Sequence, residues 1–321
     1  MPRLSIIIPV PGDLKGLEET LLSVLENRPK DCQIVVVISG NYDDPYGLAG
    51  EVDFVRAGRG IGLIGCINAG ICASRAPVVH PLLCGVKVGP GWADIALARF
   101  DDPVVAAVAP LVLDGQNPPR VVAAGVTYRW AGIVRSIGRG LSPEDALRRC
   151  PVLRDPVLRD PAAYGPDISA GFYRKAVLRR FGLFDAEAGD LLSTLDMTLA
   201  MRRAGLGCAI EPRCLTYVGQ APTVSMSPLQ RGRQIERLFW RWLPRRGRLG
   251  SVASHALIVL AECLQCVVRP TVAFRLVGRL LGMLTALVRP DWREIPESVL
   301  TTSANLTPPH FAAQTERSSA A

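Results

Sequence analysis

The sequence predicts an α/β protein with a mostly parallel sheet flanked by helices, followed by a C-terminal helical extension. Continuous apolar runs such as Leu4–Val10 have the composition of strands that are buried on both faces of a parallel sheet. Segments with helical spacing of apolar residues lie between these runs, as the crossovers of a parallel sheet require. Beyond residue 223 the pattern changes to basic and apolar helices.

The first strand, Leu4–Val10, is bounded by Pro9 and Pro11, and Asp13 is a candidate cap for a helix that runs to Asn27. A second helix is expected at 61–74, where small residues allow close packing. Further strands are expected at 33–38, 53–56, 78–83 and 104–113.

Ligands of such sheets bind at the carboxyl ends of the strands. Residues 10–13, 38–44 and 83–87 should therefore surround one crevice. The stretch 120–166 is rich in Arg, Pro and Gly and contains VLRDP twice, at 152–156 and 157–161, so we expect a long irregular loop there. The segments 170–182 and 192–205 and a strand around Ala209 then complete the domain.

The length of 321 residues suits one large domain and a smaller unit. We predict an α/β domain at 1–222, a basic and apolar helical extension at 223–296, and a disordered tail at 297–321. The nine cysteines are scattered, and the N-terminus enters a strand without a signal-peptide pattern, so we expect a reducing, cytoplasmic location.

Motifs with fixed spacing begin in the segment 60–92. Asn68 and Gly70 form an Asn-x-Gly on the second predicted helix, and a Gly-Pro-Gly-Trp ending at Trp92 follows the next apolar strand. Later in the chain, Ser-Ala-Gly at 169–171 precedes Arg174, and Phe-Gly-Leu-Phe-Asp ends at Asp185. A helix that begins with Asp196 and ends before Gly205 comes next.

In order and spacing, these motifs resemble those of family 2 glycosyltransferases, over about residues 3–220. The resemblance implies the GT-A fold, a Rossmann-like and mostly parallel sheet flanked by helices. It also implies transfer of a sugar from a nucleoside-diphosphate sugar to a hydroxyl acceptor, in envelope or exopolysaccharide assembly. By position, the nucleotide-sugar side comprises Pro9, Ser39, Asp43, Asp44, Asn68, Cys84 and Gly85. The acceptor side comprises Gly171, Arg174 and Asp196.

The second strand of the family usually ends in carboxylates that hold the base and ribose of the nucleotide. Ile38 and Ser39 occupy those positions here. Ser39 can accept one hydrogen bond, and Ile38 cannot. Asp43 and Asp44 lie a few residues later, either as replacements or as part of a solvated turn at 41–45.

The metal-binding Asp-x-Asp of the family falls on Leu83 and Gly85, and no Asp or Glu occurs between Asp53 and Asp94. The Mg²⁺ or Mn²⁺ that the family usually binds is a hard cation that prefers oxygen ligands, so we expect no metal site and no cofactor. The charge of a leaving diphosphate then needs cations from the protein. Lys87 and Arg59 are the nearest candidates, with solvated surface charges as the alternative.

The catalytic base of inverting members precedes the helix that begins near Asp196, and its positions are Ser193 and Thr194 here. Asp190 is the nearest carboxylate that can accept the proton of an attacking hydroxyl. The sequence thus predicts a GT-A domain whose metal-dependent catalysis is lost or altered. The alternative is a non-catalytic GT-A domain that binds a protein partner, such as an active transferase, or a glycan.

The C-terminal segment is strongly basic. Ser227 and Pro228 resemble a helix cap and a first-turn proline, and Ile235, Leu238, Phe239 and Trp242 share one helical face. Seven arginines lie between 228 and 250: Arg231, Arg233, Arg237, Arg241, Arg245, Arg246 and Arg248.

Two interpretations of this segment stay open. The basic face binds an anionic membrane surface at the inner side of the membrane, or the helix packs on the domain and leaves a solvated arginine face. The apolar stretch 249–268 can enter lipid more deeply, although Glu262 opposes a clean span. In a third hypothesis, residues 228–289 make the chain a peripheral membrane adaptor. No nucleic-acid module accompanies the basic run, so we expect no nucleic-acid partner.

Overall fold

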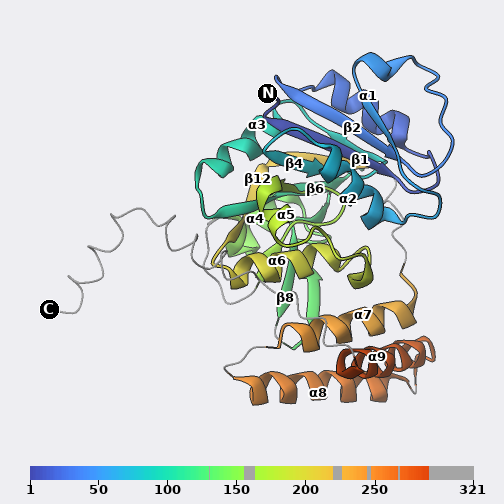
Figure 1. Cartoon of the computed structure of the whole chain (residues 1–321). Helices are drawn as coiled ribbons and strands as arrows, with labels where there is room; N and C mark the ends of the chain where they lie inside the picture. Colours follow the sequence, from blue (N-terminus) through green and yellow to red (C-terminus); the bar gives the residue numbers. More distant parts are fainter. Residues whose placement is uncertain (130, 155–162, 220–225, 244–246, 267, 289–321) are drawn as a thin grey trace, which may run out of the picture.

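The computed structural model describes residues 1–129, 131–154, 163–219, 226–243, 247–266 and 268–288. A mixed α/β domain forms one end of the molecule, and three helices, α7 (Pro228–Arg241), α8 (Arg248–Cys266) and α9 (Thr271–Val288), form the other (Figure 1). The predicted α/β class and the C-terminal helical extension are therefore both present. The predicted tail at 297–321 lies outside the described residues.

The main sheet has the strand order β3-β2-β1-β4-β11-β6-β12-β5, with β7 paired to β6. Within this sheet, the adjacent strands β3, β2, β1 and β4 run parallel to one another. Strand β11 runs antiparallel to β4, and β5 runs antiparallel to β12. The strands are β1 (Leu4–Val10), β2 (Cys32–Ile38), β3 (Asp53–Arg56), β4 (Val78–Pro81), β5 (Val86–Val88), β6 (Val105–Asp114), β7 (Val121–Ala123), β11 (Phe172–Arg174) and β12 (Gly207–Val218).

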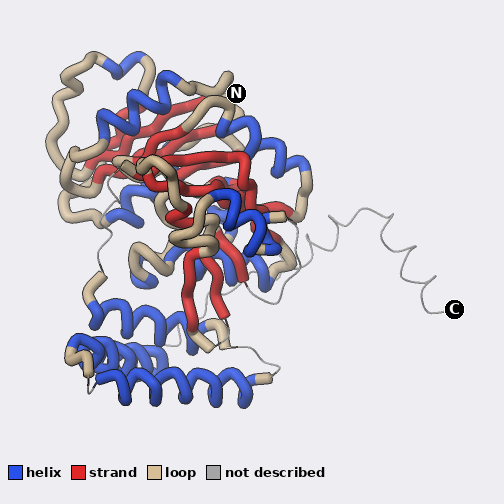
Figure 2. Tube along the Cα trace, turned by 180° about the vertical axis from the view of Figure 1, so that it is seen from behind, coloured by secondary structure: helices blue, strands red, loops and turns tan. Residues whose placement is uncertain are grey.

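Helices surround this sheet, and Figure 2 shows the strands at the centre of the domain. Strands β1 and β6 are buried almost throughout because both of their faces are covered, as their continuous apolar sequences predict. The helices of the domain are α1 (Leu17–Glu26), α2 (Leu63–Ala73), α3 (Trp92–Leu97), α4 (Pro143–Arg149), α5 (Lys175–Arg180) and α6 (Ser193–Arg203). Short 3₁₀ turns are η1 (Leu48–Gly50), η2 (Ala98–Asp101), η3 (Pro151–Leu153) and η4 (Ala186–Ala188).

Helix α1 begins later than predicted. Its N-cap is Gly16, whose φ of 79° lies in the left-handed region that glycine adopts without strain. Asp13 does not cap the helix; its Oδ1 instead accepts a hydrogen bond from the backbone N–H of Lys15, at 3.0 Å. The prediction placed the cap at the first suitable side chain and overlooked a glycine that turns the chain.

The prediction of an irregular loop at 120–166 is wrong for the described residues. This stretch holds β7, α4 and a second, antiparallel sheet of β10 (Ala163–Gly165), β8 (Val126–Arg129) and β9 (Ile133–Ser136). Short strands joined by tight turns give little periodic signal, and the many Arg and Gly residues hid them. Ser142 caps α4 in the usual way, accepting from the N–H of Asp145. The whole of the second VLRDP, at 157–161, and the last two residues of the first lie outside the described residues.

Helix α7 begins as predicted, with a capping box between Ser227 and Gln230 and a proline in the first turn. Its apolar face is buried, since Ile235, Leu238, Phe239 and Trp242 are each at most 7% exposed. Helix α9 crosses α7 at very short range: a Cβ at Gly278 would lie 2.0 Å from the carbonyl oxygen of Leu229.

Candidate functional site

The carboxyl ends of β1, β2 and β4 lie at one edge of the sheet, as predicted. The parallel register pairs Val10 with Ile38 and Ile7 with Pro81, so the loops that follow these strands start side by side. We call these loops, residues 10–16, 39–47 and 82–85, the strand-end site. A hydrogen bond links the segment after β4 to the end of β1: Cys84 Sγ donates to the carbonyl oxygen of Pro9 at 3.4 Å.

Helix α1 packs directly on the Cys84–Gly85 turn. The N–H of Gly85 donates to the Oγ1 of Thr20 at 2.8 Å and to the carbonyl oxygen of Gly16 at 3.1 Å. A Cβ at Gly16 would lie 2.7 Å from the nitrogen of Gly85, so only glycine fits there. Gly85 itself has a φ of 84°, which side chains rarely adopt. The turn is therefore held by backbone packing.

The residues at the metal position of the family do not suit a hard divalent cation. Leu83 is 3% exposed and belongs to the hydrophobic core, and Gly85 has no side chain. Burial raises the pKa of the Cys84 thiol to about 12, so at neutral pH it is a neutral donor rather than an anionic ligand. The described residues contain no group of three or more His, Cys, Asp or Glu side chains arranged to hold a metal.

The polar candidates on the nucleotide side have contacts within the protein. The Oγ of Ser39 donates to the carbonyl oxygen of Gly58 at 2.9 Å. Asp44 accepts from the N–H groups of Leu48 and Ala49, each at 3.0 Å, so its carboxylate closes the turn that leads into η1. Asp43 is exposed at the same turn. This arrangement fits the solvated-turn interpretation of Asp44 and leaves Asp43 available to a ligand.

Asn68 joins two motifs that lie far apart in the sequence. Its Nδ2 donates to the carbonyl oxygen of Phe184 at 2.8 Å, and its Oδ1 accepts from the N–H of Phe184 at 3.1 Å. Both ends of the amide are thus used to hold the segment that precedes Asp185 against α2. The spacing that the two motifs share with the family has a structural basis in this pair of bonds.

The two candidate cations differ in their surroundings. Lys87 projects from β5 and its Nζ lies 3.0 Å from Glu19 Oε2 on α1, with both side chains about half exposed. An exposed pair of this kind contributes about 1 kcal/mol or less, so an anionic ligand can compete for the lysine. Arg59 is exposed in the glycine-rich loop before α2.

Asp190 lies in the turn before α6, and burial of its carboxyl raises its pKa. No hydrogen bond or ion pair to this carboxyl occurs within the part of the chain that the structure describes. Ser193 and Thr194, which follow it, are buried. A half-buried carboxyl whose pKa is raised by burial is chemically suited to act as a general base, and this role of Asp190 stays a prediction.

The predicted acceptor-side residues Gly171 and Arg174 form hydrogen bonds within the domain. The carbonyl oxygen of Gly171 accepts from Nδ1 of the buried His80 at 2.9 Å. The guanidinium of Arg174 donates to three carbonyl oxygens, those of Val105, Phe100 and Asp102, at 2.6 to 2.8 Å.

Asp196 is fully buried and binds α7. Its Oδ1 accepts from the indole nitrogen of Trp242 at 2.8 Å and lies 3.2 Å from Nη1 of Arg241. The same guanidinium nitrogen lies 2.8 Å from Oδ2 of Asp185. Arg241 therefore bridges the two acids whose spacing matches the family.

The basic face of α7 is turned partly toward the domain, since Arg237 also pairs with Glu187 at 2.9 Å. The open choice between a membrane-binding and a packed arginine face is thus resolved for Arg237 and Arg241, which pack. Arg231, Arg233 and Arg248 are exposed, and Arg245 and Arg246 lie outside the described residues. The sequence left packing on the domain as one of two interpretations, but it did not show that Arg237 and Arg241 pair with acids of the domain, because such distant partners have no local signature.

Among the comparisons with known proteins, those with solved structures bear on the fold. No protein-family model and no curated protein matches the sequence. Solved structures do match: GalNAc-T7 with UDP, GalNAc and Mn²⁺ (TM-score 0.55, 14% identity) covers 76% of this chain. The chain spans about half of that protein, 49% of its length.

Two other similar structures are comparable in length. Residues 1–349 of TarS from S. aureus give a TM-score of 0.55 at 12% identity, with 93% of this chain and 82% of that chain covered. Mannosyltransferase PcManGT from Pyrobaculum calidifontis, in complex with GDP-Man and Mn²⁺, gives 0.50 at 13% identity, with 90% and 88% covered. The chain has the GT-A fold of nucleotide-sugar glycosyltransferases.

Proposed function

We propose that this chain is a family 2-like glycosyltransferase protein that binds a nucleoside-diphosphate sugar at the strand-end site without a divalent metal. The observation that carries the proposal is the intact GT-A frame around Leu83, Cys84 and Gly85, which offer no oxygen ligand. Two similar structures contain Mn²⁺ together with UDP or GDP-Man. The proposed difference from them is in the metal and not in the nucleotide.

In the proposed reaction, an acceptor hydroxyl attacks the anomeric carbon as the bond to the diphosphate breaks. The carboxyl of Asp190 takes the proton from that hydroxyl, and its raised pKa brings it closer to neutral pH, where a base is most effective. The diphosphate leaves with concentrated negative charge, which Lys87, released from Glu19, and the exposed Arg59 would stabilise.

We place this activity in the cytoplasm at the inner face of the membrane, in envelope or exopolysaccharide assembly, because family resemblance supplies that pathway. A second candidate function is a non-catalytic scaffold. It is favoured by the internal contacts of Ser39, Asp44 and Asn68, which engage side chains that a nucleotide would otherwise use.

Titration of the protein with UDP- and GDP-sugars in metal-free buffer, followed by a turnover assay, separates the two functions. Binding and turnover support the transferase. Asp190→Asn should then lower turnover at least about 100-fold with little change in affinity, as loss of a general base does. The matched control Asp101→Asn changes an exposed carboxylate on η2 and should leave both unchanged. Absence of binding at millimolar nucleotide supports the scaffold.

A further inference from the structure

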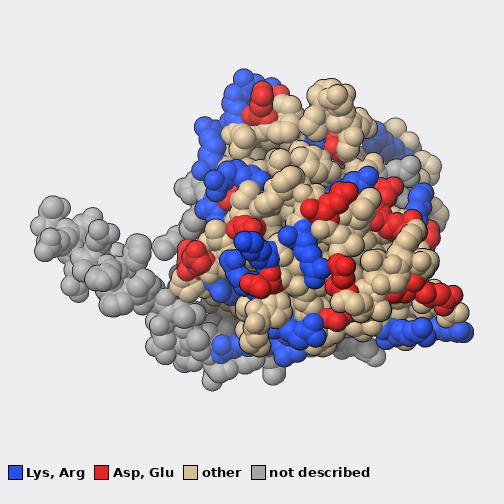
Figure 3. Space-filling view, turned by 90° about the horizontal axis from the view of Figure 1, so that it is seen from above, with Lys and Arg blue, Asp and Glu red and all other residues tan. Residues whose placement is uncertain are grey.

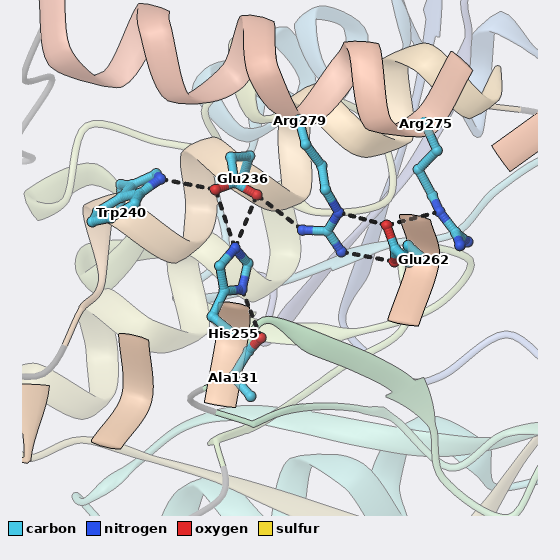
Figure 4. A network of polar contacts seen from close by, with 7 residues as sticks. All are labelled: Ala131, Glu236, Trp240, His255, Glu262, Arg275 and Arg279. Atoms are coloured by element: carbon cyan, nitrogen blue, oxygen red, sulfur yellow. Dashed lines mark hydrogen bonds and ion pairs between the residues drawn. The ribbon is translucent and has the colours of Figure 1, made fainter. Parts of the chain in front are cut away.

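A network of charged side chains is buried between the three C-terminal helices (Figure 4). Glu236 of α7 accepts from Nε2 of His255 at 3.0 Å, from Nη1 of Arg279 at 2.9 Å and from Nε1 of Trp240 at 2.9 Å. Burial alone would raise the pKa of Glu236, but the bonds from His255 and Arg279 outweigh it and hold the pKa below its usual value. Arg279 also forms a bidentate ion pair with Glu262, donating from Nε and Nη2 to the two carboxylate oxygens.

Helix α8 buries ionisable side chains and exposes apolar ones, the reverse of the usual pattern in a soluble protein. Its two buried side chains are His255 and Glu262, which lie two turns apart and face the network. The other face is apolar and exposed, with Leu257, Leu260 and Leu264 between 56% and 69% exposed. Soluble proteins bury leucine and expose glutamate, whereas helices in contact with lipid turn their ionisable residues toward the protein.

The exposed apolar residues of the chain are concentrated on this side of the molecule. Ten of the seventeen large apolar side chains that are exposed among the described residues belong to α8, α9 and the turn between them. We call these ten side chains the apolar floor: Leu249, Leu257, Leu260, Leu264, Val268, Phe274, Val277, Leu280, Leu281 and Leu284. Exposed apolar side chains gathered on two helices that pack against each other mark a binding surface for protein or lipid.

Charge favours lipid as the occupant. The single acid of α8 and α9, Glu262, is buried, while Arg248 and Arg269 at the two ends of α8 are exposed. Two copies of such a surface would bring like charges together, whereas an anionic bilayer attracts them, at about 1 kcal/mol per cation. The opposite end of the molecule differs, since Figure 3 shows acids and bases interspersed there.

We propose that the apolar floor inserts into the headgroup and upper acyl region of an anionic bilayer, with α8 and α9 lying in the membrane plane. This inference rests on the membrane location in the proposed function and is independent of sugar transfer. Helix α8 is also long and apolar enough to cross a bilayer, with a mean hydropathy of 1.5.

The contacts of α8 oppose a crossing. His255 joins α8 to the carbonyl oxygen of Ala131 in the β8–β9 turn and to Glu236, and α7 is fixed to the domain through Trp242. A crossing would break these bonds, whereas in-plane insertion keeps them. The exposed face runs along the helix axes, and the length of α8, about 28 Å, would then lie side-on to the lipid.

Co-sedimentation of the full-length protein with vesicles of phosphatidylglycerol and phosphatidylethanolamine tests the proposal. The double variant Leu257→Glu/Leu264→Glu adds two charges to the apolar floor at sites exposed enough to leave the fold intact. The control Leu22→Glu makes the same change on α1, where the leucine is 59% exposed. We expect the double variant to reduce the vesicle-bound fraction more than about tenfold and the control to leave it unchanged.

Three results would overturn the proposal: wild-type protein that stays in the supernatant, a double variant that binds like wild type, or a wild-type dimer in solution that the double variant makes monomeric. The last result would assign the apolar floor to a second copy of the chain. Nucleotide-sugar titration of the same samples separates the two proposals, because the double variant should bind nucleotide as the wild type does. Loss of nucleotide binding alone would contradict the proposed function and leave the membrane surface standing.

Discussion

The indole N–H of Trp242 donates a hydrogen bond of 2.8 Å to Asp196, a carboxylate buried at the start of α6. The next residue back, Arg241, lies 3.2 Å from the same oxygen. Family resemblance places Asp196 on the acceptor side of a transferase, and here it anchors the C-terminal helices to the domain. The α/β domain and the helical extension are therefore joined through a residue that the family resemblance assigns to the acceptor side.

Substitution Asp196→Ala should destabilise the protein by about 3–5 kcal/mol, because it leaves the buried side of Arg241 without one of its two acids. Urea unfolding measures the change. The control Glu51→Ala removes the exposed partner of Arg28 and should cost less than about 1 kcal/mol. Equal effects of the two substitutions would show that the Asp196 contact does not stabilise the junction.

The crossing of α7 and α9 depends on glycine. Gly278→Ala should cost about 1–3 kcal/mol in thermal or urea unfolding, because its Cβ would lie 2.0 Å from the Leu229 carbonyl oxygen and must push the helices apart. Gly250→Ala, on α8 with open space around it, should instead stabilise by about 0.5–1 kcal/mol through helix propensity. A harmless Gly278→Ala would mean that α9 is not packed on α7 in solution.

His80 should make the protein sensitive to mild acid. Burial lowers the pKa of His80 to about 3, against an ordinary value of 6.5, so the unfolded chain binds the proton first. The free energy of unfolding should therefore fall as the pH drops from 6.5 to 5, by up to about 1.4 kcal/mol per pH unit. This window lies above the ordinary carboxyl range.

The variant His80→Phe tests this assignment. It keeps an aromatic ring against Phe172, on which His80 stacks at 3.9 Å between centroids, and removes the titrating group. Its unfolding free energy should be nearly constant over the same pH interval. A wild-type slope that survives in the variant would assign the titration to another group.

The Cys84 thiol should be unreactive. Burial raises its pKa to about 12, so almost none of it is thiolate at pH 8. Iodoacetamide at that pH should modify the exposed Cys72 and Cys263 and leave Cys84 intact, as read by peptide mass spectrometry. Rapid labelling of Cys84 would reveal an accessible thiolate in the strand-end site, and with it a ligand for a softer metal.

The fold was predictable wherever burial is two-sided. Strand β1 has the predicted bounds Leu4–Val10, because a run that is apolar almost throughout and buried on both faces allows few other placements. The N-cap and first-turn proline of α7 were likewise visible in Ser227 and Pro228. In contrast, β8 and β9 were missed, since each strand has four residues and its pairing is set by partners elsewhere in the chain.

The candidate site was predictable only by position. The resemblance predicts which residues stand at the carboxylate positions of the family, but the sequence does not show what the remaining polar groups contact. Asn68 bonds to Phe184, 116 residues later, and Arg241 to Asp185, 56 residues earlier. No local pattern encodes such pairs. The sequence showed Glu262 only as a residue that opposes a clean membrane span; in the structure it is buried against Arg279, which leaves the exposed side of α8 without an acid.

The affinity for a UDP- or GDP-sugar, measured by calorimetry in EDTA and again in manganese, tests the proposal that nucleotide binding here needs no divalent metal. A nucleotide pocket without carboxylate ligands should give the same dissociation constant and the same turnover in both buffers, within about twofold. Manganese-stimulated turnover, or binding that appears only when manganese is added, would contradict the proposal of a metal-free nucleotide site.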